Sequence, residues 1–172
     1  MTKQEIASQQ ADSAILQLDS FLPYRLNVVT QAVSQALARL YSEEFDISVP
    51  EWRILAALGE SRIAHGAGWP GMTARDLTQH SRMGKVMVSR AAATLLDRRI
   101  LAKRANHTDR RESFLRLTAK GAKIYAAIVP RAQAFQASLE VGLSRRDAAA
   151  FDRVVLHLLR RAHDADAALR TE

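Results

Sequence analysis

A short cationic segment, residues 103–118, carries the most distinctive chemistry of the sequence. It predicts two short strands, at about 100–105 and 113–117, around a polar tip that contains Asp109, Arg110 and Arg111. Two short helical segments joined by a tight turn precede it. A cationic hairpin after a helix-turn-helix is the outline of a winged DNA-binding domain, because the hairpin can grip the duplex beside the recognition helix. The alternative is an ordinary solvated hairpin with a charged turn.

The distribution of charge favours the first interpretation. The chain has a formal net charge of +7. Residues 73–120 contain 12 Lys or Arg and only four Asp or Glu, so the whole positive excess lies in one block. A polyanion is the natural partner for such a block, through phosphate neutralisation and counterion release. An anionic membrane is the rival partner, but no segment ranks Lys and Arg along one helical face opposite large apolar residues.

Composition narrows the class of protein further. A chain of 172 residues is about one domain with helical extensions. It contains no cysteine, which excludes a disulfide, a thiolate nucleophile and a cysteine redox switch. No apolar run approaches a membrane span, and the first ten residues lack the apolar core of a signal peptide. We therefore expect a cytoplasmic protein without membrane attachment. The five histidines show no metal-ligand spacing, and the sequence indicates no cofactor.

Hydrophobic periodicity and capping signals predict a mainly α-helical chain with a small β-hairpin wing. Pro23 marks a kink or a restart after the first helix. The Gly- and Pro-rich stretch Gly59–Gly71 reads as a loop. Thr73 and Asp76, and likewise Ser144 and Asp147, have the spacing of capping boxes. The helices are expected at residues 5–19, 23–41, from Ser48 to about Leu58, 73–80, 85–98, 119–141 and from 144 onwards.

The terminal helices have more apolar surface than one small winged domain can cover. The last helix carries an apolar stripe from Phe151 to Ala162, and the helix after Pro23 carries another from Leu26 to Leu40. Pairing with a second copy of the chain would bury both, which predicts a two-fold homodimer. The predicted architecture is a winged helix-turn-helix domain at 46–120, flanked by dimerisation helices at 1–45 and 121–172.

These motifs resemble the MarR family of bacterial transcription regulators over essentially the whole chain. An Asp-Arg-Arg triplet followed by Leu-Thr and a glycine is rather specific to that family. The Thr-Ala-x-x-Leu and Val-Ser-Arg elements are weaker, because many helix-turn-helix proteins contain similar ones. The matching segments are Val49–Leu55, Met72–Leu77, Val88–Arg90, Leu95–Arg98, Asp109–Arg111, Leu115–Thr118 and Gly121.

The resemblance implies a homodimer that binds a near-palindromic double-stranded operator. Most members repress, and most release DNA when a small aromatic or phenolic anion binds where the dimer helices meet the DNA-binding domain. Two features depart from the family pattern. The stretch Gly59–Gly71 is longer than the usual connection, and the absence of cysteine excludes the mechanism of the family's organic-hydroperoxide sensors.

Residues in the recognition helix and the wing are the candidate DNA contacts. Groove-facing residues in the N-terminal half of a recognition helix reach base edges. Lys85 and Arg90 suit guanine, Ser89 suits phosphate or a base, and Val86 and Ala93 suit a thymine methyl. The alternative is a solvated face with Arg90 held in an internal ion pair.

In the wing, the resemblance places Arg111 in the minor groove, held by a salt bridge to Asp109. A narrow groove concentrates negative potential, which an oriented guanidinium exploits. His107 and Arg110 are expected to touch phosphate. The alternative is that Arg111 stabilises the hairpin through Asp109 and makes no contact with DNA.

A cluster with the chemistry to bind an aromatic carboxylate, or its thioester, is formed by Tyr24, Arg25 and Asn27 with Trp52 and Arg53. An aromatic plane can stack on the ligand, and a guanidinium can pair with its carboxylate. The alternative for Trp52 is a place in the core, with Arg53 in a surface ion pair.

Three other functions remain as alternatives. An activator or anti-silencer of the same fold needs the same DNA contacts as a repressor. A helical adaptor that never touches DNA would have no reason to gather its positive charge into one block. An enzyme is disfavoured, because the sequence has no Gly-rich phosphate loop, no cysteine and no paired acid–base cluster.

Overall fold

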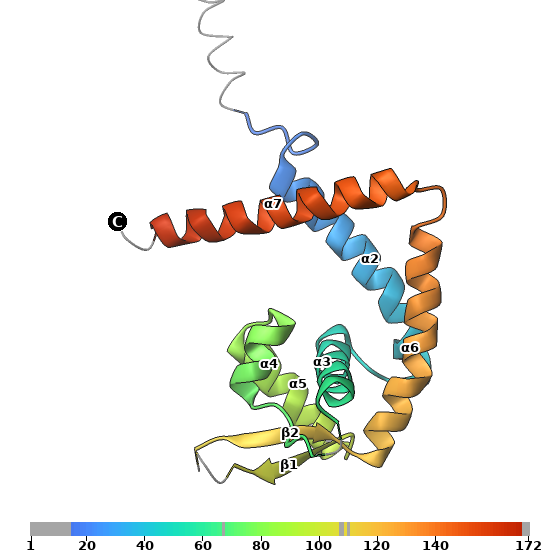
Figure 1. Cartoon of the computed structure of the whole chain (residues 1–172), viewed down its shortest axis with the longest axis vertical. Coiled ribbons are helices and arrows are strands. Elements are labelled where there is room, and N and C mark those ends of the chain that lie inside the picture. Colours follow the sequence, from blue (N-terminus) through green and yellow to red (C-terminus); the bar gives the residue numbers. More distant parts are fainter. Residues whose placement is uncertain (1–14, 67, 107–108, 110, 170–172) are drawn as a thin grey trace, which may run out of the picture. The chain divides into compact units, whose positions relative to one another are not determined.

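A computed structural model describes residues 15–66, 68–106, 109 and 111–169 of the chain. The chain divides into two compact units, Met1–Val129 and Pro130–Glu172. No helix in the described ranges is both long and apolar enough to cross a membrane. In chain order the elements are α2 Leu22–Phe45, α3 Val49–His65, α4 Ala74–Ser81, α5 Lys85–Asp97, β1 Leu101–Ala105, β2 Ser113–Leu117, α6 Ala119–Leu139 and α7 Arg145–Leu169 (Figure 1).

The first described helix, α2, begins at Leu22 with Pro23 in its first turn, so the proline marks a restart. The expected helix over 5–19 is wrong for residues 15–19, and its earlier part lies outside the described residues. Ser20 closes a turn there, because its backbone N–H and its hydroxyl both donate to the carbonyl of Gln17. Serine competes with helix formation through local hydrogen bonds of this kind.

Helix α3 is longer than expected, because Gly59–His65 continues the helix instead of opening a loop. Its start is a capping box, in which the Glu51 carboxylate accepts from the backbone N–H of Ser48 at 2.7 Å. Gly59 lies against the ring of Tyr125, and a Cβ atom at Gly59 would approach that ring to 2.4 Å. The glycine therefore permits close packing of α6 on α3 and does not end the helix.

Helices α4 and α5 form the helix-turn-helix. Thr73 and Asp76 make the predicted capping box, with bonds of 2.9 and 3.1 Å. Helix α4 ends at Ser81, and the C-cap residue Arg82 adopts the left-handed conformation (φ 56°). Helix α5 packs on both α3 and α4. Its buried residues are Val88, Ala91, Ala92 and Leu95.

The wing is an antiparallel pair in which Leu101 faces Leu117 and Ala105 faces Ser113. Met72 adds a bridge to the outer side of β2, through two backbone hydrogen bonds with Leu115 of 2.7 and 3.0 Å. Gly71 (φ 116°) makes this approach possible, because a Cβ atom there would lie 2.3 Å from the Leu115 carbonyl oxygen. The segment before α4 is thereby fixed to the wing.

The core of the first unit joins all of these elements. Leu115 of the wing and Ile128 of α6 are buried together with apolar residues of α3, α4 and α5. The inner face of α3 buries Ile54, Leu55, Ala57 and Leu58, and half-buries Trp52 and Ala56.

In the second unit, Ser144 caps α7 as predicted. The Asp147 carboxylate accepts from the backbone N–H of Ser144 at 3.0 Å, and hydrogen bonds from the Ser144 hydroxyl and backbone lower the pKa of Asp147. No described residue of α7 is buried in a single chain, and Phe151 is 67% exposed. The apolar stripe of α7 is therefore largely open to solvent in one copy.

The packing of Tyr125 on Gly59 leads to a stability prediction. Gly59→Ala should lower the free energy of unfolding by about 1–3 kcal/mol, the usual cost of overpacking. In a Tyr125→Ala background the same change should raise it by about 0.5–1 kcal/mol, because alanine is the better helix former. Urea denaturation of the four proteins measures both effects. Gly68→Ala, where a Cβ atom meets open space, is the matched control. An effect of Gly59→Ala with the same sign in both backgrounds would contradict the assignment.

Candidate nucleic-acid interface

The outer face of α5 displays all five residues predicted for base contact. Because Val88, Ala91, Ala92 and Leu95 face the core, the opposite face of the helix must point to solvent. The exposed set is Lys85, Val86, Ser89, Arg90 and Ala93. Sequence reasoning missed Met87, which is 49% exposed beside Val86. Its place outside the set Val88, Ala91, Ala92 and Leu95, which follows the i, i+3, i+4, i+7 spacing of a buried helical face, is the signal that could have identified it.

Two grooves run along the two sides of this face. One, of about 450 Å³, is lined by Ser89 and Ala93 of α5 together with Lys103 and Arg111 of the wing region. The other, of about 520 Å³, lies between the start of α3 and α5, and Val86, Met87 and Arg90 contribute to it. The fold thus brings the recognition helix and the base of the wing to one surface.

The described part of the wing tip is held by short-range hydrogen bonds. Asn106 accepts from the backbone N–H of Asp109 at 3.2 Å, and the Asp109 carboxylate accepts from the backbone N–H of Arg111 at 2.9 Å. The expected salt bridge from Asp109 to the Arg111 guanidinium is not among the contacts of these two described residues. Asp109 shapes the turn through the backbone, as Asx turns do. His107 and Arg110, also predicted as wing contacts, lie outside the described residues.

The basic block divides into structural and solvent-facing cations. Arg98 is half-buried and donates to the carbonyls of Phe45 (2.8 Å) and Asp46. Lys120 donates to the Arg98 carbonyl at 3.1 Å. The other described cations of the block are exposed, namely Arg75, Arg82, Lys85, Arg90, Arg99, Lys103, Arg104, Arg111 and Arg116. These exposed groups form the electrostatic surface that a polyanion would meet.

The structure separates the two halves of the ligand cluster predicted from the sequence. Trp52 stacks near Tyr41, with ring centroids 5.5 Å apart. Tyr24 lies 17 positions before Tyr41 on the same straight run of α2, which places it roughly 25 Å away along the helix axis. Tyr24, Arg25 and Asn27 therefore do not meet Trp52 and Arg53 within one chain. The length of α2 is the physical reason.

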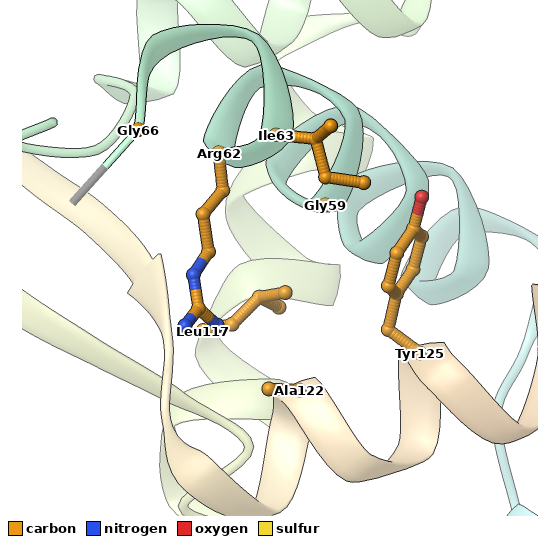
Figure 2. A pocket seen from close by; sticks show the side chains of 7 residues that line it. All are labelled: Gly59, Arg62, Ile63, Gly66, Leu117, Ala122 and Tyr125. Carbon is orange, nitrogen blue, oxygen red and sulfur yellow. The ribbon is translucent and has the colours of Figure 1, made fainter.

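A pocket of about 420 Å³ lies instead between the second half of α3, the end of β2 and the first turns of α6 (Figure 2). Arg62 extends into it from α3, and Tyr125 extends toward α3 from α6. Aliphatic groups of Ile63, Leu117 and Ala122 complete the lining. The pocket thus combines one guanidinium, one phenol and apolar walls.

Tyr125 also belongs to a row of aromatic rings. Its ring stacks on Trp52 with centroids 6.1 Å apart, and Trp52 in turn lies against the buried Tyr41. Burial, with a smaller contribution from the Glu60 carboxylate, raises the pKa of Tyr125. The phenol therefore keeps its proton at neutral pH and can donate a hydrogen bond. Sequence reasoning missed Arg62 and Tyr125, since only the fold brings positions so far apart together.

The described polar side chains outside this pocket do not form a metal centre. Among the described residues, no group of three or more His, Asp or Glu is placed to hold a metal ion. His80 pairs with Glu60 at 3.1 Å, and the His65 ring stacks on Trp69 with centroids 6.0 Å apart. The first contact connects α3 with α4, and the second connects the end of α3 with the loop that follows it.

No protein-family model and no curated protein matches the chain by sequence. Solved structures do match. A MarR/EmrR family transcriptional regulator from Acinetobacter sp. ADP1 is 18% identical over 87% of this chain and 99% of its own, with a TM-score of 0.71. MepR of S. aureus, solved as a DNA complex, is 17% identical over 84% and 98%, with a TM-score of 0.71. BpsR of Bordetella bronchiseptica, solved to explain how 6-hydroxynicotinic acid regulates its DNA binding, is 20% identical over 87% and 98%, with a TM-score of 0.68.

The chain therefore has the winged helix fold of MarR-type transcriptional regulators, as the sequence predicted. Its mainly helical architecture and its two-stranded wing agree with that fold.

The charged surface leads to a prediction about random-sequence duplex. Binding should weaken linearly in log–log form as salt rises, with a slope of about −0.9 per neutralised phosphate. Lys103→Ala should reduce that slope by about one unit, because it removes one exposed cation of the groove. Arg146→Ala, an exposed arginine in the first turn of α7, should leave the slope unchanged. The slope can be measured by fluorescence anisotropy of a labelled duplex at salt concentrations from about 50 to 200 mM. Duplex binding that is absent, or insensitive to salt, would exclude this surface as a nucleic-acid interface.

Proposed function

We propose that the chain is a homodimeric, ligand-responsive DNA-binding transcriptional regulator, and that it acts in the cytoplasm as a repressor. The observation that carries the proposal is the shared surface of α5 and the wing, where Ser89, Ala93, Lys103 and Arg111 line one groove. Recognition helices of this fold enter the major groove while adjacent cations contact the backbone. The complexes of MepR with DNA and the DNA regulation of BpsR support the same assignment.

The exposed apolar surface supports the dimer. Large apolar side chains are exposed both between Ile15 and Val29 and along α7. For example, Ile15 is 66% exposed and Phe151 is 67% exposed. On each of these segments, exposed apolar surface of this kind is costly in water and indicates an interaction site. A second copy of the chain would bury it and place two recognition helices on one duplex. Two half-sites about one helical turn apart would then be read together.

Two alternatives remain distinguishable by experiment. An activator or anti-silencer would use the same DNA contacts, so only transcription from the bound promoter separates it from a repressor. A helical adaptor would not bind duplex at all. The regulators with solved structures that resemble this chain support a regulator over an enzyme.

The effector we propose is a small aromatic carboxylate, free or as a thioester, bound in the pocket formed by α3, β2 and α6. The Arg62 guanidinium can pair with a carboxylate in a fork, and the neutral Tyr125 phenol can donate a hydrogen bond to it. Ile63, Leu117 and Ala122 would cover an aromatic ring. To release DNA, the effector must bind the free protein better than the DNA-bound protein.

Selection of preferred sites from a randomised duplex library tests the DNA-binding proposal. Arg90→Ala should change the preferred sequence, because we assign this exposed arginine of α5 to the base edges. Lys103→Ala, the control, should weaken binding to all sequences alike. Arg111→Ala should weaken operator binding by about 1–3 kcal/mol with the dimer intact. If wild type and Arg90→Ala select identical sites, Arg90 takes no part in base readout.

Titration of benzoates, salicylates and hydroxycinnamates, free and as coenzyme A thioesters, tests the effector site. An active compound should weaken operator binding by about 5- to 150-fold, the usual range of allosteric coupling. Arg62→Ala should abolish this response and leave DNA affinity unchanged. Gel shift reports the release of DNA. Tryptophan fluorescence, to which Trp52 contributes from its place against Tyr125, reports binding of the compound.

Arg53→Ala is the matched control for that experiment. Arg53 is one of the two arginines expected from the sequence, with Arg25, and it lies outside the pocket lining. A response that is lost with Arg53→Ala and kept with Arg62→Ala would show that the pocket is misplaced.

A further inference from the structure

The segment Arg98–Ile100, between α5 and β1, joins three helices within the first unit. We call it the junction. Its first residue, Arg98, is the C-cap of α5 and reaches back to the end of α2. Its carbonyl groups are held by the first residues of α6. The end of the recognition helix and the start of the wing are therefore anchored to the same three residues.

On the α2 side, the contact is made by one guanidinium. Arg98 donates from Nη2 to the carbonyl of Phe45 at 2.8 Å and from Nη1 to the carbonyl of Asp46. The last carbonyls of a helix have no partner within it, so they are natural acceptors for an arginine. The planar fork of arginine offers two donors in a fixed geometry, which lysine does not.

The carboxylate of Asp46 contributes less to this contact. It lies 3.6 Å from Nη2 of Arg98 but is 96% exposed, so solvent screens the pair. The two carbonyl bonds therefore define the position of Arg98. The Arg98 side chain as a whole is 27% exposed, so most of it is covered by the protein.

On the α6 side, three residues hold the junction. The Thr118 hydroxyl lies 2.8 and 3.0 Å from the carbonyls of Arg99 and Ile100, and Lys120 donates to the carbonyl of Arg98 at 3.1 Å. Gly121 has no side chain to obstruct this contact, because a Cβ atom there would lie 2.3 Å from the Ile100 carbonyl oxygen. The junction is thus held to α2 through the Arg98 side chain and to the start of α6 through its backbone carbonyls.

We propose that Arg98 is a positioning residue, which couples the orientation of the recognition helix to α2 and does not itself contact DNA. The proposal rests on the proposed function, in which α2 contributes to the dimer. In a dimer, the distance between the two recognition helices decides whether both fit one operator. Loss of the Arg98 contact frees the C-terminal end of α5 from α2 and leaves the base-contacting face of α5 intact.

Electron paramagnetic resonance between two spin labels tests this directly. The chain has no cysteine, so Thr94→Cys on the exposed face of α5 introduces one label per subunit. In this background, Arg98→Gln should broaden the distribution of distances between the two labels. Arg99→Gln, the same change at the next position, should not. Asp46→Asn should also retain the wild-type distribution, because it preserves the carbonyl that Arg98 binds.

The second measurement uses duplexes with one half-site, and duplexes with two half-sites at varied spacing. Arg98→Gln should bind one half-site like wild type, yet bind the best two-site duplex about tenfold more weakly, a typical coupling strength. Its preference among spacings should flatten. Arg98→Lys keeps the charge but lacks the planar fork that binds two carbonyls, so it should flatten the preference among spacings in the same way. This second variant keeps the test valid if Arg98→Gln fails to fold.

An unchanged distance distribution and spacing preference in the Arg98 variants would overturn the proposal. Equal loss of affinity for one and two half-sites would also overturn it, because Arg98 would then act as a DNA contact or as a general stability residue. Absence of any dipolar signal in the wild-type background would instead refute the proposed homodimer, and this proposal with it.

Discussion

The burial of one narrow face of α5 is the constraint on which the rest of the interface depends. Two of its four buried residues are alanines, so the helix lies close to α3 and α4. A rotation of one residue position, about 100°, would turn Arg90 toward the core, where an unpaired charge is very costly. The core therefore fixes which residues face solvent. The proposed base readout by Val86, Ser89 and Arg90 therefore depends on the packing of the core, which sets the rotation of α5 about its axis.

Local signals predicted most of the elements correctly. Capping boxes at Thr73 and Ser144 fixed the starts of α4 and α7, because their hydrogen bonds connect residues only three positions apart. Alternation of side chains predicted β2 at its observed bounds. The charge excess of residues 73–120 could be counted from the sequence without any structure. Such features depend on neighbours in the sequence, so the sequence alone determines them.

The errors have a common cause in contacts between distant positions. Gly59 was interpreted as the start of a loop, because it opens a Gly- and Pro-rich stretch that ends at Gly71. A glycine is required at this position because the ring of Tyr125, 66 positions later in the chain, packs against it. The predicted ligand cluster is divided within one chain for a similar reason, because α2 holds Tyr24 away from Trp52. Arg62 and Tyr125 come together only through the packing of α6 on α3, and no local pattern reports that packing.

The start of α6 connects the candidate pocket with the junction. Thr118, Lys120 and Gly121 contact the carbonyls of Arg98–Ile100, and Ala122 and Tyr125 line the pocket within the next turn and a half. A ligand that displaced Tyr125 would act on the same helical turns that hold the end of α5. Coupling between sites needs an element that both sites bias. The first two turns of α6 meet that requirement, because their N-terminal end is bonded to the backbone that follows the recognition helix and their next turn forms one wall of the pocket.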